Sequence, residues 1–197
     1  MSASPSTEEA RPAPAPPEAL AALDLFALGR QAAAARDALW SGRGFFVRTR
    51  AEDADAPEGN RIVRFPFKLG ENDAERLARL ADIGAAAPPP WGIMPAPVGE
   101  PFGLDTLRCF ALCRLALPRV AHVLADVSTL GPRLAQMAFG FGADELFAPI
   151  VAERALRLGA NANNPALTRT EAVTLLRGAG LLPCERMADG SLQEVTP

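Results

Sequence analysis

Hydrophobic and polar residues follow two different periods along this chain. Apolar positions three or four residues apart predict helices over residues 18–41, 73–83, 105–117, 131–141 and 150–158, and in a last segment that begins after Thr168. Alternating or β-branched apolar positions predict strands over residues 45–50, 61–69, 91–94 and 121–127. Because strands and helices take turns along the chain, the pattern favours βα units around a parallel sheet over an all-α or all-β arrangement.

The first helical segment carries its apolar residues on one side. Arg30 and Arg36 are expected to face away from the core, and Gly29 is expected to divide the segment into two short helices. The predicted buried stripe consists of Leu20, Leu23, Phe26, Ala27, Ala34, Ala38 and Leu39.

Local signals predict where two later helices begin. Asn72 is expected to cap the helix over residues 73–83, in which Glu75 and Arg79 have the spacing of an i,i+4 ion pair. Thr168, with Glu171 three residues later, has the spacing of a capping box.

The length of 197 residues suits one domain whose core is large enough to fold without disulfides. Residues 1–17 are rich in Pro and Ala, which predicts a disordered tail and leaves residues 18–197 as a single domain. The net charge is −3 and the basic residues are scattered, so nucleic acid is not expected as a partner. The longest apolar runs are too short to span a bilayer and no signal peptide is visible, so we expect a cytoplasmic protein without a membrane partner.

Several spaced motifs occur in the second half of the chain. Residues 122–146 (HVLADVSTLGPRLAQMAFGFGADEL) contain a strand, a G-x-R-x-A-Q helix start and an F-G-A-D-x-L turn. Residues 167–186 continue with L-T-x-x-E, an A-G pair, Pro183 and Arg186, and residues 105–117 add matching positions upstream. In this order the motifs resemble the C-terminal barrel segment of the radical-SAM enzymes of menaquinone biosynthesis, the aminofutalosine synthase and dehypoxanthine futalosine cyclase family. Residues 25–50 and 67–83 resemble two earlier segments of the same family.

The resemblance implies an α/β fold, namely a truncated, partly open (βα) barrel-like parallel sheet of about five strands. In the family, the first strand leads into C-x-x-x-C-x-x-C, whose thiolates hold a 4Fe–4S cluster that cleaves SAM. Here Arg50 is followed by AEDADAPEGN, which contains no cysteine. We therefore predict neither the 4Fe–4S cluster nor SAM as a cofactor of this chain.

Cys109 and Cys113 form a C-x-x-x-C pair, but Ala116 stands where a third ligand would be. On a helix the two thiols share one face, so they could hold a metal only with partners from elsewhere in the chain. Burial of both residues as small hydrophobic side chains is the interpretation that we favour.

Candidate ligand contacts come from charged or titratable residues near predicted strand ends. Asp144 and Glu145 follow a Gly-Ala turn and are expected near the C-terminal mouth of the sheet, where α/β barrels bind their ligands. For Asp144, a role in contacting a ligand and a role in capping the turn are both open. His122 opens a predicted strand, where we expect a structural hydrogen bond ahead of a catalytic role. The other candidates are Arg48 and Arg50 at the end of the first strand and Glu71 in the segment over residues 67–83.

The resemblance and the missing cysteines together predict a protein that acts without catalysis. It would bind an intermediate of the futalosine pathway to menaquinone, or associate with an enzyme of that pathway or with a second copy of itself, because a shortened barrel exposes sheet edges. One alternative is an active enzyme that uses a non-standard metal or SAM site. A gene product without selected activity is the third possibility.

Overall fold

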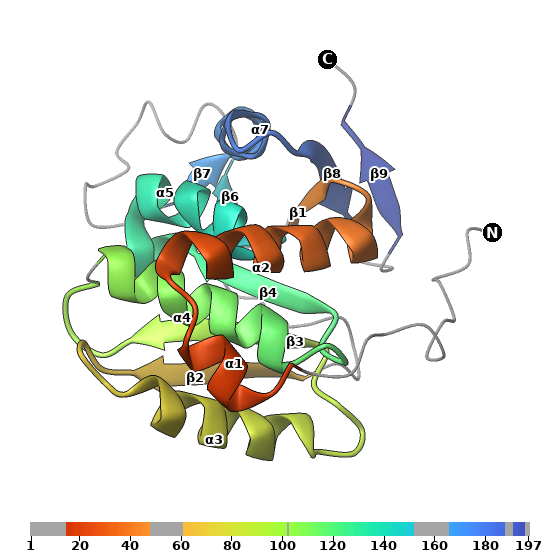
Figure 1. The fold of residues 1–197 in the computed structure, drawn as a ribbon. Helices are drawn as coiled ribbons and strands as arrows, with labels where there is room; N and C mark the ends of the chain where they lie inside the picture. Colours follow the sequence, from red (N-terminus) through yellow and green to blue (C-terminus); the bar gives the residue numbers. More distant parts are fainter. Residues whose placement is uncertain (1–14, 48–60, 102, 152–165, 188–190, 196–197) are drawn as a thin grey trace.

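The computed structural model describes residues 15–47, 61–101, 103–151, 166–187 and 191–195. Its central element is a seven-stranded sheet in the order β2-β3-β4-β5-β1-β8-β9 (Figure 1). Every neighbouring pair is parallel except β8 and β9, which are antiparallel. The strands of this sheet are β1 (Arg43–Val47), β2 (Ile62–Phe67), β3 (Gly92–Pro97), β4 (His122–Asp126), β5 (Glu145–Phe147), β8 (Leu182–Arg186) and β9 (Leu192–Glu194). A separate two-stranded sheet joins β6 (Ile150–Val151) to β7 (Leu167–Thr168).

The helices pack against one face of the large sheet, which we call the helix face. Side chains of that face, such as Phe46, Phe65 and Val123, belong to the same hydrophobic cluster as buried residues of the helices. In Figure 1, α2 and α4 cross in front of the strands, and α2 packs directly against α4. The helices among the described residues are α1 (Pro17–Ala21), α2 (Leu25–Trp40), α3 (Asp73–Gly84), α4 (Gly103–Ala116), α5 (Val127–Ala138) and α7 (Arg169–Gly178), with a 3₁₀ turn η2 (Phe139–Phe141).

The opposite face, which we call the far face, is defined by Phe45, Met94, Leu124, Glu145 and Cys184. Successive side chains of a strand point to opposite faces, and parallel register places Phe45 beside both Glu145 and Cys184. All five side chains are buried. The four apolar ones lie outside the helix-face cluster, so the sheet separates two packed regions.

The predicted fold class is confirmed, because the sheet is mostly parallel, is covered by helices and does not close into a barrel. The expected number of about five strands is wrong, since the main sheet has seven. The hydrophobic pattern predicted β1 to β4 individually but not β5, β8 or β9. β5 and β9 have three residues each, too few to show a period, and β8 is buried at four successive positions instead of alternating.

The first helical segment breaks at a different place from the one predicted. The break lies around Asp24, whose side chain accepts a hydrogen bond from the Ala27 amide and caps α2. Gly29 lies inside α2, where a Cβ atom would come within 2.8 Å of the Phe141 ring. It is therefore a position of close packing and not a helix boundary.

The predicted buried stripe of α2 is also wrong. Phe26 is 70% exposed, whereas Leu28 and Ala32 are buried. Arg36, which was expected to face solvent, is buried and donates through Nη1 to the Phe139 carbonyl oxygen. The Asp37 carboxylate pairs with the same guanidinium. These two acceptors allow the Arg36 side chain to be buried.

Both predicted helix caps are confirmed. The Asn72 side chain accepts from the Ala74 amide, and Thr168 and Glu171 form the reciprocal bonds of a capping box. The partner predicted for Arg79 is wrong, because its Nη2 lies 2.5 Å from a carboxylate oxygen of Glu71.

Other expectations concern residues that lie wholly or partly outside the described ranges. Residues 1–14 of the predicted tail lie outside the described residues, as do most of residues 150–158. Ile150, the expected start of a helix, instead begins strand β6. No helix in the described part of the chain is long and apolar enough to cross a membrane.

Candidate ligand site on the far face

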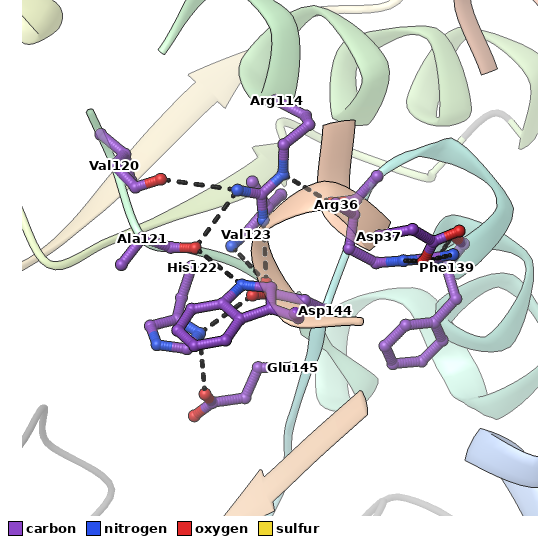
Figure 2. A network of polar contacts seen from close by, with 12 residues as sticks. Arg36, Asp37, Arg114, Val120, Ala121, His122, Val123, Phe139, Asp144 and Glu145 are labelled. Carbon is purple, nitrogen blue, oxygen red and sulfur yellow. Dashed lines mark hydrogen bonds and ion pairs between the residues drawn. The ribbon is translucent and has the colours of Figure 1, made fainter. Parts of the chain in front are cut away.

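Three titratable side chains come together where β4 and β5 begin: His122 opens β4, Asp144 immediately precedes β5 and Glu145 opens β5 (Figure 2). The Nδ1 atom of His122 lies 3.0 Å from Oδ2 of Asp144 and 3.5 Å from Oε2 of Glu145. All three residues are at most 2% exposed. Buried charges persist in proteins when they are paired, so the partners of each group decide what this cluster can do.

Asp144 is held by charges and hydrogen bonds from several elements. Arg114 of α4 places Nη2 3.1 Å from Oδ1 of Asp144, and the Val123 amide donates to the same oxygen at 2.6 Å. Burial alone would raise the pKa of Asp144, but Arg114, His122 and the Val123 amide outweigh burial and hold that pKa below its ordinary value. Asp144 is therefore an ionised carboxylate over the ordinary pH range.

Arg186, from the last residue of β8, reaches the same cluster from the other side. Its Nη2 atom lies 2.6 Å from Oε2 of Glu145 and 3.2 Å from Nε2 of His122. Arg186 is only 7% exposed, and its buried Nε atom has no hydrogen-bond partner in the structure. One N–H of this guanidinium is therefore left without an acceptor.

Aromatic rings surround the imidazole and the guanidinium. The Trp40 ring stacks on His122 with centroids 4.6 Å apart, and the Trp91 ring lies 4.4 Å away from the imidazole. Phe45 meets the imidazole edge-on, and the guanidinium carbon of Arg186 lies 4.7 Å from the centroid of Trp91. We call these residues, together with Glu145, the far-face site.

One hydrogen bond of His122 is assigned by its geometry. A proton on Nδ1 is donated to the Asp144 carboxylate, which can only accept. Nη2 of Arg186 lies 3.2 Å from Nε2 and 3.5 Å from Nδ1, so the guanidinium contacts both ring nitrogens.

Only some of the predicted site residues lie close together in the structure. His122 opens β4 as predicted, but Asp144 and Glu145 lie at the start of β5 and not at the C-terminal mouth of the sheet. Glu71 follows β2, at the opposite end of the strands, and its carboxylate binds Arg79 and the Lys68 amide. Arg48 and Arg50 lie outside the described residues.

The site also contains four residues that the sequence pattern did not predict as members: Arg114, Arg186, Trp40 and Trp91. Arg186 did carry a signal, because it belongs to the closing motif of residues 167–186. The two tryptophans are also the only ones in the chain, and large aromatic rings are common in ligand sites. Neither signal says that these residues converge on one histidine.

The cysteines do not fit an iron–sulfur cluster. Cys109 and Cys113 are buried in the helix-face cluster, whereas Cys184 lies on the far face, so the sheet separates them. Burial raises the pKa of Cys109 well above its ordinary value and also raises that of Cys184. Thiols of this kind resist the ionisation that metal binding requires. Among the described residues, no three His, Cys, Asp or Glu side chains form a metal-binding group.

Two curated proteins show sequence similarity to this chain. The aminodeoxyfutalosine synthase of Thermus thermophilus is 33% identical over 86 residues, which cover 44% of this chain and 23% of that protein. The 5-amino-6-(D-ribitylamino)uracil–L-tyrosine 4-hydroxyphenyl transferase 1 of Methanosarcina barkeri is 31% identical over 157 residues, or 71% of this chain and 42% of that protein. This chain is related to radical-SAM enzymes.

The relationship covers less than half the length of either radical-SAM relative. No protein-family model matches the chain. The similarity therefore establishes a relationship without transferring an activity, and the site itself must carry any functional argument.

Proposed function

We propose that this chain is a non-catalytic relative of radical-SAM enzymes that binds a small molecule at the far-face site. An intermediate of menaquinone biosynthesis, such as aminodeoxyfutalosine, is the ligand that the similarity to the Thermus protein favours. The observation that carries the proposal is Arg186, a buried guanidinium that lies against Trp91 and Phe45 with its Nε atom unpartnered.

A buried, unsatisfied N–H lowers stability by about 1–3 kcal/mol. An unsatisfied buried group calls for an explanation, and a ligand that supplies the missing acceptor is the one that we propose for Arg186. Nε atoms of Arg76 and Arg79 also lack partners, so the aromatic surroundings of Arg186 set it apart. The Trp40 and Trp91 rings that flank His122 add flat apolar surface next to the guanidinium. Planar rings stack on such surfaces, and guanidinium groups bind carboxylate or carbonyl oxygens.

The donor set supports binding over radical chemistry. SAM cleavage needs an electron source, and the family's cluster needs three thiolates at one place. This chain has three cysteines in total, and they lie on both faces of the sheet. The residues present therefore do not fit the cluster.

The test is calorimetric titration of the purified chain with aminodeoxyfutalosine and, separately, with 5-amino-6-(D-ribitylamino)uracil. We expect one of them to bind with a stoichiometry of about one and to raise the unfolding temperature, since a ligand at a hundred times its Kd stabilises by about 2.7 kcal/mol. Arg186→Gln is expected to weaken binding by tenfold or more, because it removes the guanidinium.

The matched control is Arg169→Gln. Arg169 also pairs with a buried glutamate, Glu185, but it lies on the helix face and its side chain is half-exposed. It should leave the affinity unchanged. Absence of binding by both compounds would contradict the proposal, as would a brown iron–sulfur absorbance after anaerobic reconstitution that disappears in Cys109→Ser.

Association with a pathway enzyme or with a second copy is the other half of the proposal. The feature in its favour is the open sheet, in which β2 pairs only with β3 and β9 only with β8 among the described strands. Unpaired strand edges are sites for adding a strand from another chain. Light scattering coupled to size exclusion tests this on the purified chain, alone and mixed with an aminodeoxyfutalosine synthase. The mass of a single chain when alone, and no species heavier than the separate proteins in the mixture, would exclude association.

A further inference from the structure

One corner of the helix layer combines exposed apolar and basic side chains. Phe26 and Arg30 lie four residues apart on α2 and therefore share one face of that helix. Arg133 and Met137 have the same spacing on α5. Phe26 is 70% exposed and Met137 is 54% exposed, and both arginines are exposed as well. We call these four residues the basic corner.

The two halves of the basic corner lie close together. The 3₁₀ turn η2 packs against both α2 and α5, and a Cβ atom on Gly29 of α2 would lie 2.8 Å from the ring of Phe141 in η2. In Figure 1, α5 lies next to the first turns of α2. The exposed faces of the two helices are therefore neighbouring surfaces.

The arginines of the basic corner differ from most other arginines of the fold. Neither has an ion pair within the part of the chain that the structure describes, whereas an exposed arginine such as Arg43 pairs with Glu194. Unpaired positive charge next to exposed apolar side chains is suited to a protein surface that carries carboxylates. The basic corner therefore favours an acidic partner.

The chain itself carries such a surface on α3. Glu75, Ala78 and Asp82 are exposed and lie on the side of α3 that is opposite to its buried residues. Glu75 has no ion pair with Arg79, because Arg79 binds Glu71 instead. Asp82 also has no ion pair among the described residues. We call Glu75, Ala78 and Asp82 the acidic face.

We propose that two copies of this chain form a dimer in which the basic corner of each copy binds the acidic face of the other. The two surfaces are opposite in charge, and the small side chain of Ala78 leaves room for a large apolar side chain of the basic corner. Both surfaces lie on the side of the helix layer that faces away from the sheet, so one two-fold axis can form the contact twice. This inference rests on the proposed association with a second copy, and it places the contact on helices instead of at the sheet edges.

A second copy fits these surfaces better than an unrelated partner does. Each chain carries one surface of each charge, so the dimer brings carboxylates to the unpaired arginines of both copies. An unrelated acidic protein would cover the basic corner and leave the acidic face open. Because salt screens the attraction between exposed charges, the dimer should dissociate more readily as the salt concentration rises.

Charge reversal provides the test. The corner variant carries Arg30→Glu and Arg133→Glu, and the α3 variant carries Glu75→Arg and Asp82→Arg. All four residues are exposed, so neither variant should disturb the core. Analytical ultracentrifugation at about 0.1 mM, where a complex with a micromolar Kd is largely formed, should show a dimer for the wild type and a single chain for each variant. An equal mixture of the two variants should restore the dimer, because the reversed charges match on both sides.

The matched control is Arg61→Glu, which reverses one exposed charge beside β2, outside both surfaces. It should leave the dimer intact. A second measurement uses the unaltered chain, whose dimer should have a Kd at least about tenfold higher in 0.5 M than in 0.05 M NaCl. A dimer held by backbone hydrogen bonds between sheet edges would respond far less to salt.

The outcomes separate this inference from the proposed function. A dimer that persists in both variants, or that salt does not weaken, would overturn the inference and leave association through the sheet edges standing. A wild type that stays a single chain would contradict both the inference and the association on which it rests, without bearing on ligand binding. Two folded variants that fail to associate when mixed would also overturn the inference. Circular dichroism checks the fold of each variant, and the salt dependence of the wild type decides the matter if a variant does not fold.

Discussion

Replacing Asp144 with asparagine tests whether the buried charge pair with Arg114 stabilises the fold. Asp144 is fully buried, and the Arg114 side chain is 1% exposed. Removing one partner of a buried pair costs about 3–5 kcal/mol, because it leaves the other charge uncompensated. We expect about 3 kcal/mol, the lower end of that range, since Arg114 also donates to the Gly142 and Ala121 carbonyls.

Urea denaturation at neutral pH measures this change in the free energy of unfolding. Glu194→Gln is the control, because Glu194 is 57% exposed and pairs with the half-exposed Arg43. An exposed pair of this kind contributes about 0–1 kcal/mol. If Asp144→Asn lowered the stability no more than Glu194→Gln does, the buried pair would not be a source of stability and our account of the cluster would be wrong.

The same pair predicts a pH dependence. The pKa of Asp144 is lowered in the folded protein, so the unfolded chain binds more protons between that pKa and the ordinary value of 3.8. The stabilisation is therefore complete above about pH 5 and is lost as the pH falls toward the folded pKa. Unfolding free energies measured between about pH 2 and pH 6 should fall less steeply with acid in Asp144→Asn than in the wild type; equal slopes would contradict the prediction.

Three further predictions concern a glycine, a helix cap and the buried cysteines. Gly142→Ala should lower the free energy of unfolding by about 2 kcal/mol or more, because Gly142 has a φ of +91° and a Cβ would lie 2.8 Å from a side-chain atom of α4. Gly140→Ala, where a Cβ meets nothing within 4 Å, should change it far less. Thr168→Ala should cost about 1 kcal/mol through loss of the capping box, and a cost near zero in urea denaturation would refute this. In native protein, Cys109 and Cys184 should react with a thiol reagent only at the rate of unfolding, since burial raises the pKa of both; rapid labelling without denaturant would show that they are accessible.

Features that depend on neighbours in sequence could be predicted. Asn72 and Thr168 cap helices because each side chain reaches an amide two or three residues away. A few consecutive residues are therefore enough to predict the cap. The alternation of strands and helices likewise gave the fold class. Arg186 belongs to the motif of residues 167–186, which the sequence showed. The contacts that Arg186 makes could not be predicted from that motif.

Features that depend on distant partners could not be predicted. Arginine is ordinarily a surface residue, yet Arg36, Arg76 and Arg114 are all buried. Two examples show what holds them: Arg36 donates to the Phe139 carbonyl, and Arg76 donates to both carboxylate oxygens of Asp105. These acceptors belong to other elements of the fold. Hydrophobic periodicity contains no information about such pairs. The face of α2 that it predicted to be buried was therefore wrong.

The position of β1 governs the order in which this sheet can be assembled. Phe45 in β1 pairs with Glu145 in β5 and with Cys184 in β8, so the earliest strand of the chain occupies an interior place between two late ones. During synthesis β2, β3 and β4 can associate as they emerge, whereas β1 has no partner strand until β5 is made, and its second partner, β8, follows later still. Contacts of such long sequence separation slow folding, and the waiting strand presents the apolar pair Phe45 and Phe46 to other chains in the meantime.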